Sequence, residues 1–508
     1  MDDERWRKLL KKHVNEFRTI MSNDPPAKCE PLEVHWNSEL AAKVRPSRIS
    51  YTSDQKLFLN FYAQKLIQNG YAFENNRARY VSEVLVLPKV ERPKNFEEDW
   101  RLVLNLKKAN ACCEVIYWPL PTQYLFKPKF YIMLDLKNGY WQIRLNVNSQ
   151  ELFSFCTHRQ VLTPTKIVQG TADAVMYFTY VVANIFKEFM YKGLILWVDD
   201  LLIYGETVEE VYRLLAWVLK KSCESGLKFN PKKLYLLTEE ITWCGKAITP
   251  NGVSVDPKRK DALANMPLPK NGAELMQFVH AANWIRTSLP AFAKVFGKLT
   301  DWLNVLLKDG RRTSRRAKGL CLEWDEDKTH AFEEAKESIL SVVTQAHPNP
   351  AYTKVLFTDV SDLHWGAFLG QIKEFDIKKE VTTQSMEPMY FLSGTFRGPQ
   401  VKWATPDKKE YSIVEAVERL RYLMICPEGF RLYTDHRNLR FMNNPWNTAK
   451  LNVRARLVRW VLKLQGYRSD VEHVAGELNL WADLLSRWGA KPIEREKNHG
   501  SFFFESRG

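Results

Sequence analysis

Hydrophobic residues in the first half of the chain form short runs that end at charged or turn-forming residues. The run at 194–204 is apolar on both sides of Asp199 and Asp200, and the run at 131–140 carries Asp135. A short apolar run bounded by polar residues is typical of a buried β-strand. The pattern therefore predicts strands that hold three carboxylates, two of them at the tip of a hairpin.

Other segments show the periodicities of further helices and strands. Apolar residues at helical spacing, followed by Asn69 and Gly70, predict a helix over 53–68. Runs rich in β-branched and aromatic residues predict strands. The remaining expectations are a polar helix over 1–22 that ends at residues 23–26, an extended stretch over 27–50, strands over 81–87 and 101–106, two strands between 131 and 157 that flank residues 137–140, helices over 171–190 and 207–224, a second hairpin of strands 241–245 and 247–255 with a turn at 250–252, mainly helices over 256–308, and a helix over 325–343.

The last third of the chain has a different pattern. Past His347, strand patterns alternate with helical ones up to about residue 488, which predicts an α/β domain. Residues 308–319 form a basic segment that precedes this part. Two interpretations of it have equal weight: a linker that touches a phosphate backbone, and a solvated loop. Residues 489–508 are expected to form a poorly ordered tail.

Composition narrows the class of protein. The chain has 508 residues and a net charge of +15, with 45% hydrophobic residues, so it is long enough for several packed domains. A protein this basic usually binds a polyanion, nucleic acid first, although a merely solubilising charge is the alternative. No apolar stretch reaches the ~18–20 residues of a membrane span, and the N-terminus lacks the apolar core of a signal peptide. The eight cysteines contain no CxxC pair, so neither a zinc site nor a disulfide framework is indicated, and a reducing compartment fits.

The three aspartates indicate a particular chemistry. A carboxylate within an apolar run is costly unless a cation meets it. Converging carboxylates are the hard oxygen ligands that Mg²⁺ takes, and two such ions about 3.5–4 Å apart can hold the attacking and leaving oxygens of a phosphoryl transfer. An isolated Asp-Asp pair would more often mark the end of a strand. The apolar flanks and the upstream Asp135 favour the metal site here.

Neighbouring residues suit a triphosphate. Lys94 and Arg101 precede Asp135 in a basic stretch, and cations there would neutralise charge on a departing pyrophosphate. Gln169 lies in a Val-Gln-Gly sequence between Asp135 and the Asp-Asp pair. The spacing therefore predicts a nucleotide site around the carboxylates.

Residues 134–144, 197–200 and 226–233 resemble successive motifs of the reverse transcriptases of Gypsy-type LTR retrotransposons and, more distantly, of retroviruses. The resemblance covers roughly residues 25–488. For Tyr140 the alternative to a functional role is an ordinary core aromatic. The roles that the resemblance implies are metal binding for Asp135, Asp199 and Asp200, phosphate binding for Lys94 and Arg101, support of the nucleotide sugar for Gln169, and exclusion of a 2′-OH for Tyr140.

The same resemblance extends beyond the Asp-Asp pair. The Trp-Cys-Gly sequence that ends at Gly245 resembles a hairpin that grips the primer end, and residues 275–290 resemble a thumb helix that follows the minor groove. The implied nucleic-acid contacts are Trp243, Cys244, Gly245, Gln277, His280 and Trp284.

Some residues depart from the family pattern. Trp197 replaces the usual Tyr or Phe, and His280 stands where a Gly commonly allows close approach to the duplex. Asn105 and Lys107 stand where Asp and Arg are usual. These departures bear on fidelity and affinity rather than on the chemistry, because the metal-binding acids are intact.

A second set of four acids lies in the predicted α/β domain. Asp359 and Asp435 end predicted strands, Glu410 opens a predicted helix and shares its apolar face, and Asp483 lies in a helical segment. Each acid alone would more often be a helix cap or a surface charge. The four in this order, with their neighbours, resemble the Asp-Glu-Asp-Asp site of ribonuclease H, which implies metal-dependent cleavage of RNA in a hybrid.

Together these inferences predict a multidomain α+β and α/β protein with a right-hand polymerase (fingers, palm and thumb) followed by a ribonuclease H-like domain. The expected boundaries are an N-terminal extension over 1–50, fingers and palm over 51–255, a thumb over 256–308, a basic linker or connection over 309–350, and the ribonuclease H domain over 351–488. The resemblance implies two Mg²⁺ ions per active site (Mn²⁺ being the alternative), dNTP substrates, and an RNA template, DNA primer and RNA/DNA hybrid as partners.

Several alternatives stay open at the level of the sequence. The chain is expected to be part of a larger polyprotein, since no protease, zinc or integrase motif is present. It is expected in the cytoplasm, including virus-like particles, with nuclear entry and a homodimer as open questions and no membrane partner. A catalytically silent nucleic-acid-binding subunit and a host-adopted reverse transcriptase are the rival functions.

Overall fold

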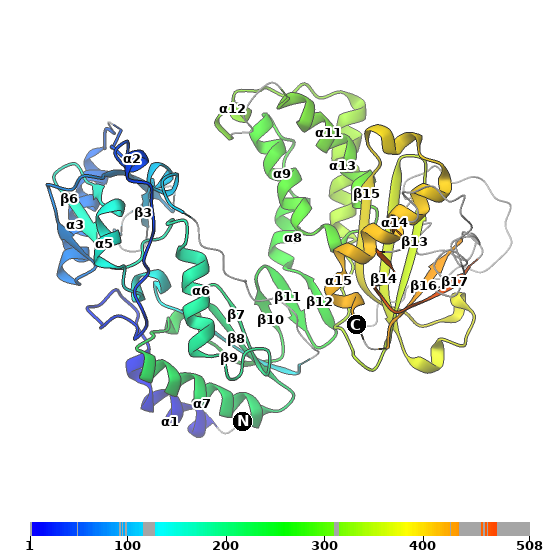
Figure 1. Cartoon of the computed structure of the whole chain (residues 1–508), viewed down its shortest axis with the longest axis horizontal. Coiled ribbons are helices and arrows are strands. Elements are labelled where there is room, and N and C mark those ends of the chain that lie inside the picture. Colours follow the sequence, from blue (N-terminus) through cyan, green and yellow to red (C-terminus); the bar gives the residue numbers. More distant parts are fainter. Residues whose placement is uncertain are drawn as a thin grey trace. The chain divides into compact units, whose positions relative to one another are not determined.

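The chain divides into two compact units, residues 1–241 and 242–508, which we describe separately. The structure is a computed structural model (Figure 1). It describes residues 3–47, 49–90, 93, 95–96, 99–114, 128–308, 314–426, 428–435, 459–460, 463–464 and 466–474.

The first unit is built on a four-stranded antiparallel sheet with the order β7-β8-β4-β9. Its strands are apolar at most positions, and Ile132, Leu196 and Leu201 are almost completely buried. The helices α6 (Ala174–Ile185) and α7 (Val208–Ser225) pack on this sheet. The strands are β4 (Phe130–Asp135), β7 (Leu194–Trp197), β8 (Asp200–Gly205) and β9 (Tyr235–Thr238).

A five-stranded sheet with the order β1-β6-β5-β2-β3 forms the other part of this unit. Its separate core is covered by helix α3 (Ser53–Gln68), which begins at a capping box of Thr52 and Gln55. The strands are β1 (Ala72–Glu74), β2 (Ser82–Pro88), β3 (Trp100–Leu104), β5 (Phe155–Cys156) and β6 (Val161–Pro164). The short helices of the unit are α2 (Ser38–Ala41), α4 (Lys107–Asn110), η2 (Gly139–Gln142), α5 (Val147–Gln150), η3 (Glu151–Phe153) and η4 (Pro231–Lys233).

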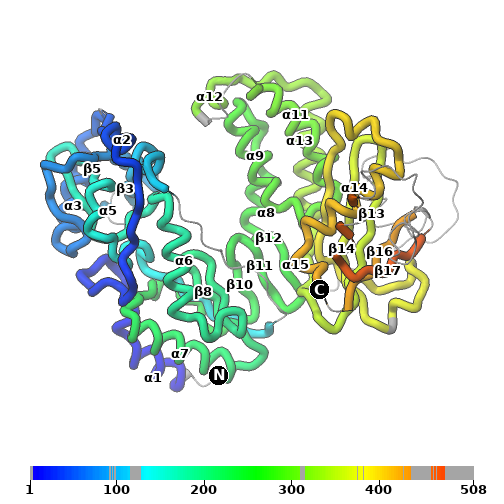
Figure 2. Tube along the Cα trace, viewed as in Figure 1, coloured from blue at the N-terminus to red at the C-terminus, as the bar shows by residue number. Residues whose placement is uncertain are grey.

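The N-terminal segment lies along this unit (Figure 2). The predicted helix over 1–22 is too long: helix α1 covers Asp3–Lys12, and a 3-10 turn η1 covers Val14–Glu16. The helix ends because Phe17 then pairs with Phe229 in a β-bridge. Farther on, Leu32 pairs with Leu145 and is fully buried, so the segment belongs to the core of the unit.

The second unit starts with a three-stranded sheet and a group of helices that share one core. The helices predicted over 256–308 and 325–343 are confirmed. The strands are β10 (Ile241–Trp243), β11 (Lys246–Thr249) and β12 (Gly252–Val255), and the helices are α8 (Pro257–Ala264), α9 (Gly272–Trp284), η5 (Arg286–Ser288), α10 (Phe292–Val295), α11 (Gly297–Leu306), α12 (Ser314–Lys318) and α13 (Glu326–Leu340).

The remainder of the second unit is a five-stranded mixed sheet with the order β15-β14-β13-β16-β17. Strands β13, β14 and β15 are antiparallel neighbours, and β16 and β17 continue the sheet in parallel. Helix α14 packs on β13 and β14, as Figure 1 shows. The elements are β13 (Thr353–Val360), β14 (His364–Ile372), η6 (Glu374–Asp376), η7 (Val381–Thr383), β15 (Glu387–Thr395), η8 (Gly398–Lys402), α14 (Thr405–Arg419), α15 (Arg421–Met424), β16 (Phe430–Thr434) and β17 (Ser469–His473).

Two expectations about local structure were wrong. Between residues 131 and 157 only β4 adjoins residues 137–140, because the chain continues into short helical turns before β5. The strand expected over 247–255 is broken at the predicted turn into β11 and β12, which pair with each other. Of the two interpretations of the basic segment, a solvated loop does not fit its described part over 314–318, since Ala317 of α12 is fully buried in the helical core.

The predicted domain boundaries stay predictions, although the contacts bear on one of them. Helix α13 was assigned to the linker or connection, yet Phe332 and Ile339 of this helix are fully buried in the same core as Phe278 of α9. Packing therefore joins α13 to the predicted thumb. The tail over 489–508 lies outside the described residues.

Candidate active sites

The three aspartates of the first unit meet at one edge of the β7-β8-β4-β9 sheet. Asp135 ends β4 and lies directly opposite Asp200, the first residue of β8. Asp199 is in the two-residue turn between β7 and β8, and its backbone carbonyl accepts a hydrogen bond from the amide of Leu136 at 2.8 Å. The turn begins at Val198, which has a φ of 55°. A β-branched residue in this left-handed region is strained, so the turn is held by the two strands rather than by its own preference.

Like charges gather at this edge. Burial, together with the neighbouring carboxylates of Asp199 and Asp135, raises the pKa of Asp200 to about 6. Burial also raises the pKa of Asp199. Carboxylates opposite each other across two strands repel, and little water is available to screen them. The edge therefore needs positive charge.

Lys233 supplies one such charge. Its ammonium lies 2.6 Å from Oδ2 of Asp135, whose side chain is almost completely buried. Asn230 donates a second, longer hydrogen bond to Oδ1 of Asp135 at 3.4 Å. The sequence motif that ends at Lys233 was recognised, but Lys233 was not predicted as a site residue. A lysine two residues after a proline in an Asn-Pro-Lys-Lys sequence was the available signal.

The donor set of this edge suits a divalent metal ion. Asp199 and Asp200 have raised pKa values, and Asp135 is paired with a lysine. Carboxylate oxygens of this kind are the ligands that Mg²⁺ prefers. Among the described residues, no three acidic, histidine or cysteine side chains converge closely enough to hold a metal as they stand. The three aspartates therefore have the right ligand atoms and lie at the same edge of the sheet. To hold a metal ion, their side chains would have to turn toward it.

Tyr140 lies on the turn that follows β4. Its ring is half-buried and packs on the ring of Phe178 in α6, with 5.1 Å between the ring centres. Burial raises the pKa of its hydroxyl, and the nearby Asp199 carboxylate raises it further. A Cβ atom on the preceding Gly139 would come within 2.6 Å of Phe178, so this turn fits closely against α6. Tyr140 thus lies near the carboxylates and also has a packing contact.

The other predicted nucleotide contacts come from separate elements. Gln169 is exposed in a turn that Asn110 holds by accepting from the amide of Ala172 at 3.1 Å and donating to the carbonyl of Gly170 at 2.8 Å. Arg101 is exposed on β3, opposite Leu87. Lys94 lies outside the described residues.

In the second unit, the predicted nucleic-acid contacts form two groups. Trp243 is buried at the end of β10, and Cys244 and Gly245 both have positive φ, which makes a tight two-residue hairpin turn to β11. A Cβ on Gly245 would come within 2.9 Å of Trp284 and 2.5 Å of Arg259. The hairpin turn therefore contacts the end of α9.

The exposed face of α9 carries the second group. Gln277, His280 and Trp284 recur at spacings of three and four residues and are all exposed, while Leu275 and Phe278 are completely buried. Gln277 and His280 also line an open cavity beside α12. One helix thus presents three of the predicted contacts on one side.

The acids of the α/β domain lie at one end of its sheet. Residue Phe357 of β13 pairs with Tyr433 of the parallel β16, so Asp359 and Asp435, two residues farther on, leave adjacent strands at the same end. Glu410 of α14 is completely buried against this sheet. Lys409 forms an ion pair with Asp435. Asp483 lies outside the described residues, so three of the four predicted acids are placed together.

Comparison with known families identifies both parts of the chain. Residues 93–248 match the family described as reverse transcriptase (RNA-dependent DNA polymerase). Residues 349–467 match the RNase H-like domain found in reverse transcriptase. The chain carries a reverse transcriptase domain joined to a ribonuclease H-like domain. Domains of these two kinds generally use divalent metals.

The chain is similar to Pol polyproteins of LTR retrotransposons. The retrovirus-related Pol polyprotein from transposon opus of Drosophila melanogaster is 25% identical over 95% of the chain. That from transposon gypsy of the same fly is 24% identical over 86%, and the transposon Tf2-3 polyprotein of Schizosaccharomyces pombe is 28% identical over 80%. The chain spans 47%, 41% and 29% of the lengths of these three relatives.

Solved structures show the same fold. The foamy viral protease-reverse transcriptase in complex with RNA/DNA hybrid superposes with a TM-score of 0.76 at 18% identity and covers 100% of this chain and 63% of its own. The same viral protein in complex with dsDNA gives 0.75 at 19% identity and covers 94% of both chains. The predicted polymerase and ribonuclease H-like fold is therefore confirmed. No helix of the part that the structure describes is long and apolar enough to cross a membrane.

Proposed function

We propose that the chain copies RNA and DNA templates into DNA and degrades the RNA of the resulting RNA/DNA hybrid. The observation that carries this proposal is the edge where Asp135 faces Asp200 within a matched reverse transcriptase domain. The foamy viral relative was solved with an RNA/DNA hybrid, which supports this class of substrate. The activity is that of an RNA-directed DNA polymerase and of an endonuclease.

For the polymerase, the side chains supply binding and charge. Asp135, Asp199 and Asp200 would hold the metal ions, which supply charge neutralisation at the phosphate being transferred. Arg101 would bind the triphosphate of the incoming nucleotide, and Lys94 would act with it. In this proposal the reacting phosphate would be bound by residues from four separate elements: the end of β4, the β7–β8 turn, β3 and the turn that carries Gln169.

Lys233 is the cation that pairs with Asp135 in the absence of a metal ion. Its ammonium would compete with a metal ion for Oδ2 of Asp135, because two cations on the same oxygen repel each other. When a metal ion binds, the ammonium becomes available to neutral or anionic groups of the substrate. The ion pair of the free protein therefore gives the buried carboxylate a cationic partner in the place where the metal ion would bind.

For hydrolysis of the RNA strand, Asp359, Glu410 and Asp435 would bind the metal ions, with Asp483 as the fourth acid. Completely buried Glu410 is suited to this role, because an ionised carboxylate at 0% exposure is stable only beside a cation. The chemistry needs no covalent intermediate on the protein. The 2′-OH and the shape of the hybrid would distinguish the RNA strand from the DNA strand.

The partners follow from charge and from the exposed face of α9. A net charge of +15 favours sequence-independent contact with phosphates and makes the affinity salt-dependent. Gln277, His280 and Trp284 would follow the template–primer duplex, and the turn at Gly245 would hold the primer end. A homodimer stays a proposal with no structural contact to support it.

Primer extension on a 5′-labelled RNA template tests both activities at once. The expected result is a full-length DNA product and shortened labelled RNA in the presence of Mg²⁺. DNA synthesis without RNA cleavage would limit the function to the first unit. The absence of both, with hybrid binding retained, would favour the rival function of a silent nucleic-acid-binding subunit.

A further inference from the structure

Helix α12 lies against the N-terminal end of helix α9 (Figure 1). Ala317 of α12 is completely buried, and a Cβ atom on Gly272, the first residue of α9, would come within 3.0 Å of the carbonyl oxygen of Ala317. The segments next to the two helices also pair, since Asn271 and Cys321 form an antiparallel bridge. The amide of Gly272 donates to the carbonyl of Leu320 at 2.9 Å. Packing and backbone pairing therefore fix α12 on α9.

The outward side of α12 is basic. Arg315, Arg316 and Lys318 are exposed, whereas Ala317 between them is buried. Arg315 and Lys318 are three residues apart, so they lie on the same side of this short helix. In the part of the chain that the structure describes, neither of these two side chains is within ion-pair distance of a carboxylate. Two positive charges of α12 thus face solvent without a matching anion.

Lys318 lies on the same side of the molecule as the predicted nucleic-acid contacts of α9. It lines an open cavity of about 350 Å³ together with Gln277 and His280. The carboxylate in this lining belongs to Glu274, which accepts a hydrogen bond from the side chain of Asn271 at 2.7 Å. Glu274 is thereby held at the start of α9 and does not pair with Lys318.

The opposite end of α9 carries Trp284. A Cβ atom on Gly245 would contact the Trp284 ring, so the turn after β10 lies beside this end of the helix. Helix α9 has 13 residues. At 1.5 Å per residue it is about 20 Å long, and phosphates of one strand are about 3.4 Å apart along a duplex, so the helix spans about six base pairs.

We propose that α12 is a second anchor for the template–primer duplex, in which Arg315 and Lys318 bind phosphates about six base pairs from the primer end. Guanidinium and ammonium groups bind phosphate oxygens through charge-assisted hydrogen bonds, and such contacts do not depend on the base sequence. This inference rests on the proposed function, because it takes α9 as the helix that follows the duplex. It adds to that function two residues outside the predicted contacts.

Anchors at both ends of one helix have a mechanical consequence. A duplex that is held only beside Trp284 is free to tilt away from α9. A second contact about 20 Å away restrains this tilt, and two linked contacts bind more tightly than either one alone. The duplex should therefore stay bound for longer, and more nucleotides should be added in each binding event.

Salt titration of duplex binding tests the proposal. A fluorescent DNA primer–template is titrated with the full chain in EDTA, without dNTP, and anisotropy gives the association constant K at each salt concentration. Arg315→Gln/Lys318→Gln should reduce the slope of log K against log salt by about 0.9 for each lost phosphate contact and weaken binding about tenfold or more at about 0.1 M salt. Arg315→Lys/Lys318→Arg keeps both charges and should keep the wild-type slope.

A matched control removes two positive charges elsewhere. Lys220→Gln/Lys221→Gln changes helix α7, where no nucleic-acid contact is predicted, and should bind with the wild-type slope. Because Arg315 and Lys318 are exposed, the α12 variant should also keep the wild-type melting temperature. If the double variant does not fold, Lys318→Gln alone repeats the test with half the expected change in slope.

Uncharged methylphosphonate linkages in the duplex test the position of the contact. A patch of them about five to seven base pairs from the primer 3′ end should weaken binding by the wild type. The same patch should have little effect on the α12 variant, because that variant has already lost the contact. A patch about 15 base pairs from the primer end, beyond the span of α9, should affect both proteins equally.

Two results would overturn the proposal: equal salt slopes for the wild type and the α12 variant, and an equal effect of the near patch on both proteins. Primer extension by the wild type would show in either case that the proposed function stands. A wild-type chain that neither binds nor extends the primer–template would remove the proposed function and this inference together.

Discussion

The ammonium of Lys233 lies 2.6 Å from Oδ2 of Asp135, although the two side chains come from segments 98 positions apart in the sequence. Asp135 is almost completely buried, whereas the Lys233 side chain is 58% exposed. The lysine therefore reaches from solvent to a carboxylate that also faces Asp200. Metal binding by the three acids should therefore also depend on Lys233.

Replacing Lys233 by methionine tests this dependence. Lys233→Met should lower the melting temperature of the metal-free protein, because the Asp135 carboxylate loses its cation; we expect a cost on the order of 1 kcal/mol for this half-exposed pair. Added Mg²⁺ should then raise the melting temperature more in the variant than in the wild type, since no ammonium competes for the oxygen. Differential scanning calorimetry with and without Mg²⁺ measures both effects. An equal Mg²⁺ response in both proteins would contradict the competition.

The acids of the first unit should serve synthesis alone. Asp200→Asn is expected to lower the rate of DNA synthesis about 10³-fold or more and to leave RNA cleavage in a preformed hybrid unchanged. The same change should stabilise the metal-free protein, because it removes one of three carboxylates that repel each other. Extension and cleavage assays are run on the same preparations. Wild-type synthesis by the variant would remove Asp200 from the site.

The acids of the second unit should serve cleavage alone. Glu410→Gln keeps the shape of a completely buried side chain and removes its charge, so folding should be retained while RNA cleavage is lost. Primer extension on the RNA template should continue at the wild-type rate. Glu415→Gln, at an acid of the same helix that pairs with Arg419, is the matched control and should cleave normally. Normal cleavage by Glu410→Gln would mean that the metal-binding acids lie elsewhere.

Local pattern was sufficient to predict part of the structure. The helix over Ser53–Gln68 and the hairpin that presents Asp199 and Asp200 are confirmed with nearly the predicted limits, because each depends on periodicity and on residues adjacent in sequence. The end of α1 was missed because it is set by the bridge from Phe17 to Phe229. No local pattern encodes a partner so far along the chain, since such pairing depends on the packing of the whole unit.

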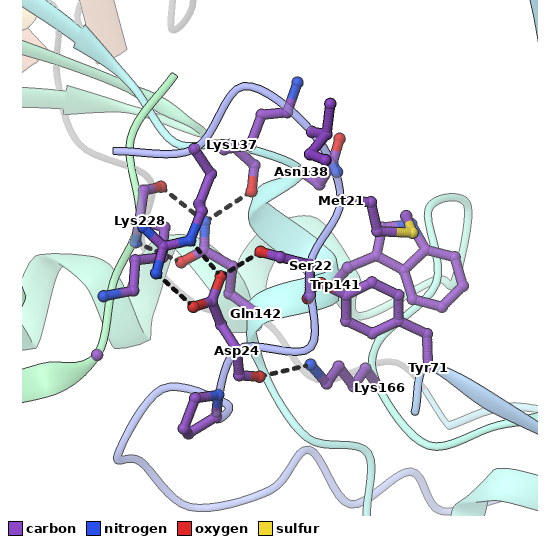
Figure 3. A pocket seen from close by; sticks show the side chains of 14 residues that line it. Met21, Ser22, Asp24, Tyr71, Lys137, Asn138, Trp141, Gln142, Lys166 and Lys228 are labelled. Atoms are coloured by element: carbon purple, nitrogen blue, oxygen red, sulfur yellow. Dashed lines mark hydrogen bonds and ion pairs between the residues drawn. The ribbon is translucent and has the colours of Figure 1, made fainter. Parts of the chain in front are cut away.

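The candidate sites show the same division. Motif and strand position were enough to predict that Asp135, Asp199 and Asp200 converge, whereas the burial of Lys166 was not predicted. Lys166 and Asp24 are 142 positions apart, and an isolated lysine within a strand-like sequence is most simply explained as an exposed residue. Only the folded structure shows that Lys166 is buried beside the N-terminal segment (Figure 3).

Tyr140 has two roles to separate. If its ring excludes a 2′-OH, Tyr140→Val should raise the ratio of ribonucleotide to deoxynucleotide incorporation, because smaller volume removes the clash. If its contact with Phe178 serves only packing, kcat/KM should fall by the same factor for both substrates, and the melting temperature should fall as well. The measurement is the ratio of kcat/KM for the two substrates, together with thermal unfolding. An unchanged ratio with a lower melting temperature would assign Tyr140 to the core.

Lys166 should give the protein a distinct dependence on alkaline pH. Burial lowers its pKa to about 8 from a usual value of 10.5; the Arg144 guanidinium lowers it too, whereas the Asp24 carboxylate opposes the shift. The ring of Tyr71 is the other group that faces this ammonium, and burial, with help from Asp24, raises the pKa of its hydroxyl to about 12. Lys166 therefore loses its proton first.

The sign of the effect follows from proton binding. Between pH 8 and 10.5 the unfolded chain holds a proton at this position that the folded chain has lost, so the unfolding free energy should rise with pH through this window. Below pH 8 both states are protonated, and the cost of the buried charge is present in full. The total gain is on the order of 3 kcal/mol.

The comparison with Lys166→Met isolates this contribution, because other lysines with lowered pKa values are common to both proteins. The variant should be more stable than the wild type at pH 7, and the difference should shrink as the pH rises from 8 to 10. Urea unfolding at intervals of one pH unit measures it. A stability difference that is constant with pH would show that Lys166 stays charged in the folded protein throughout this range.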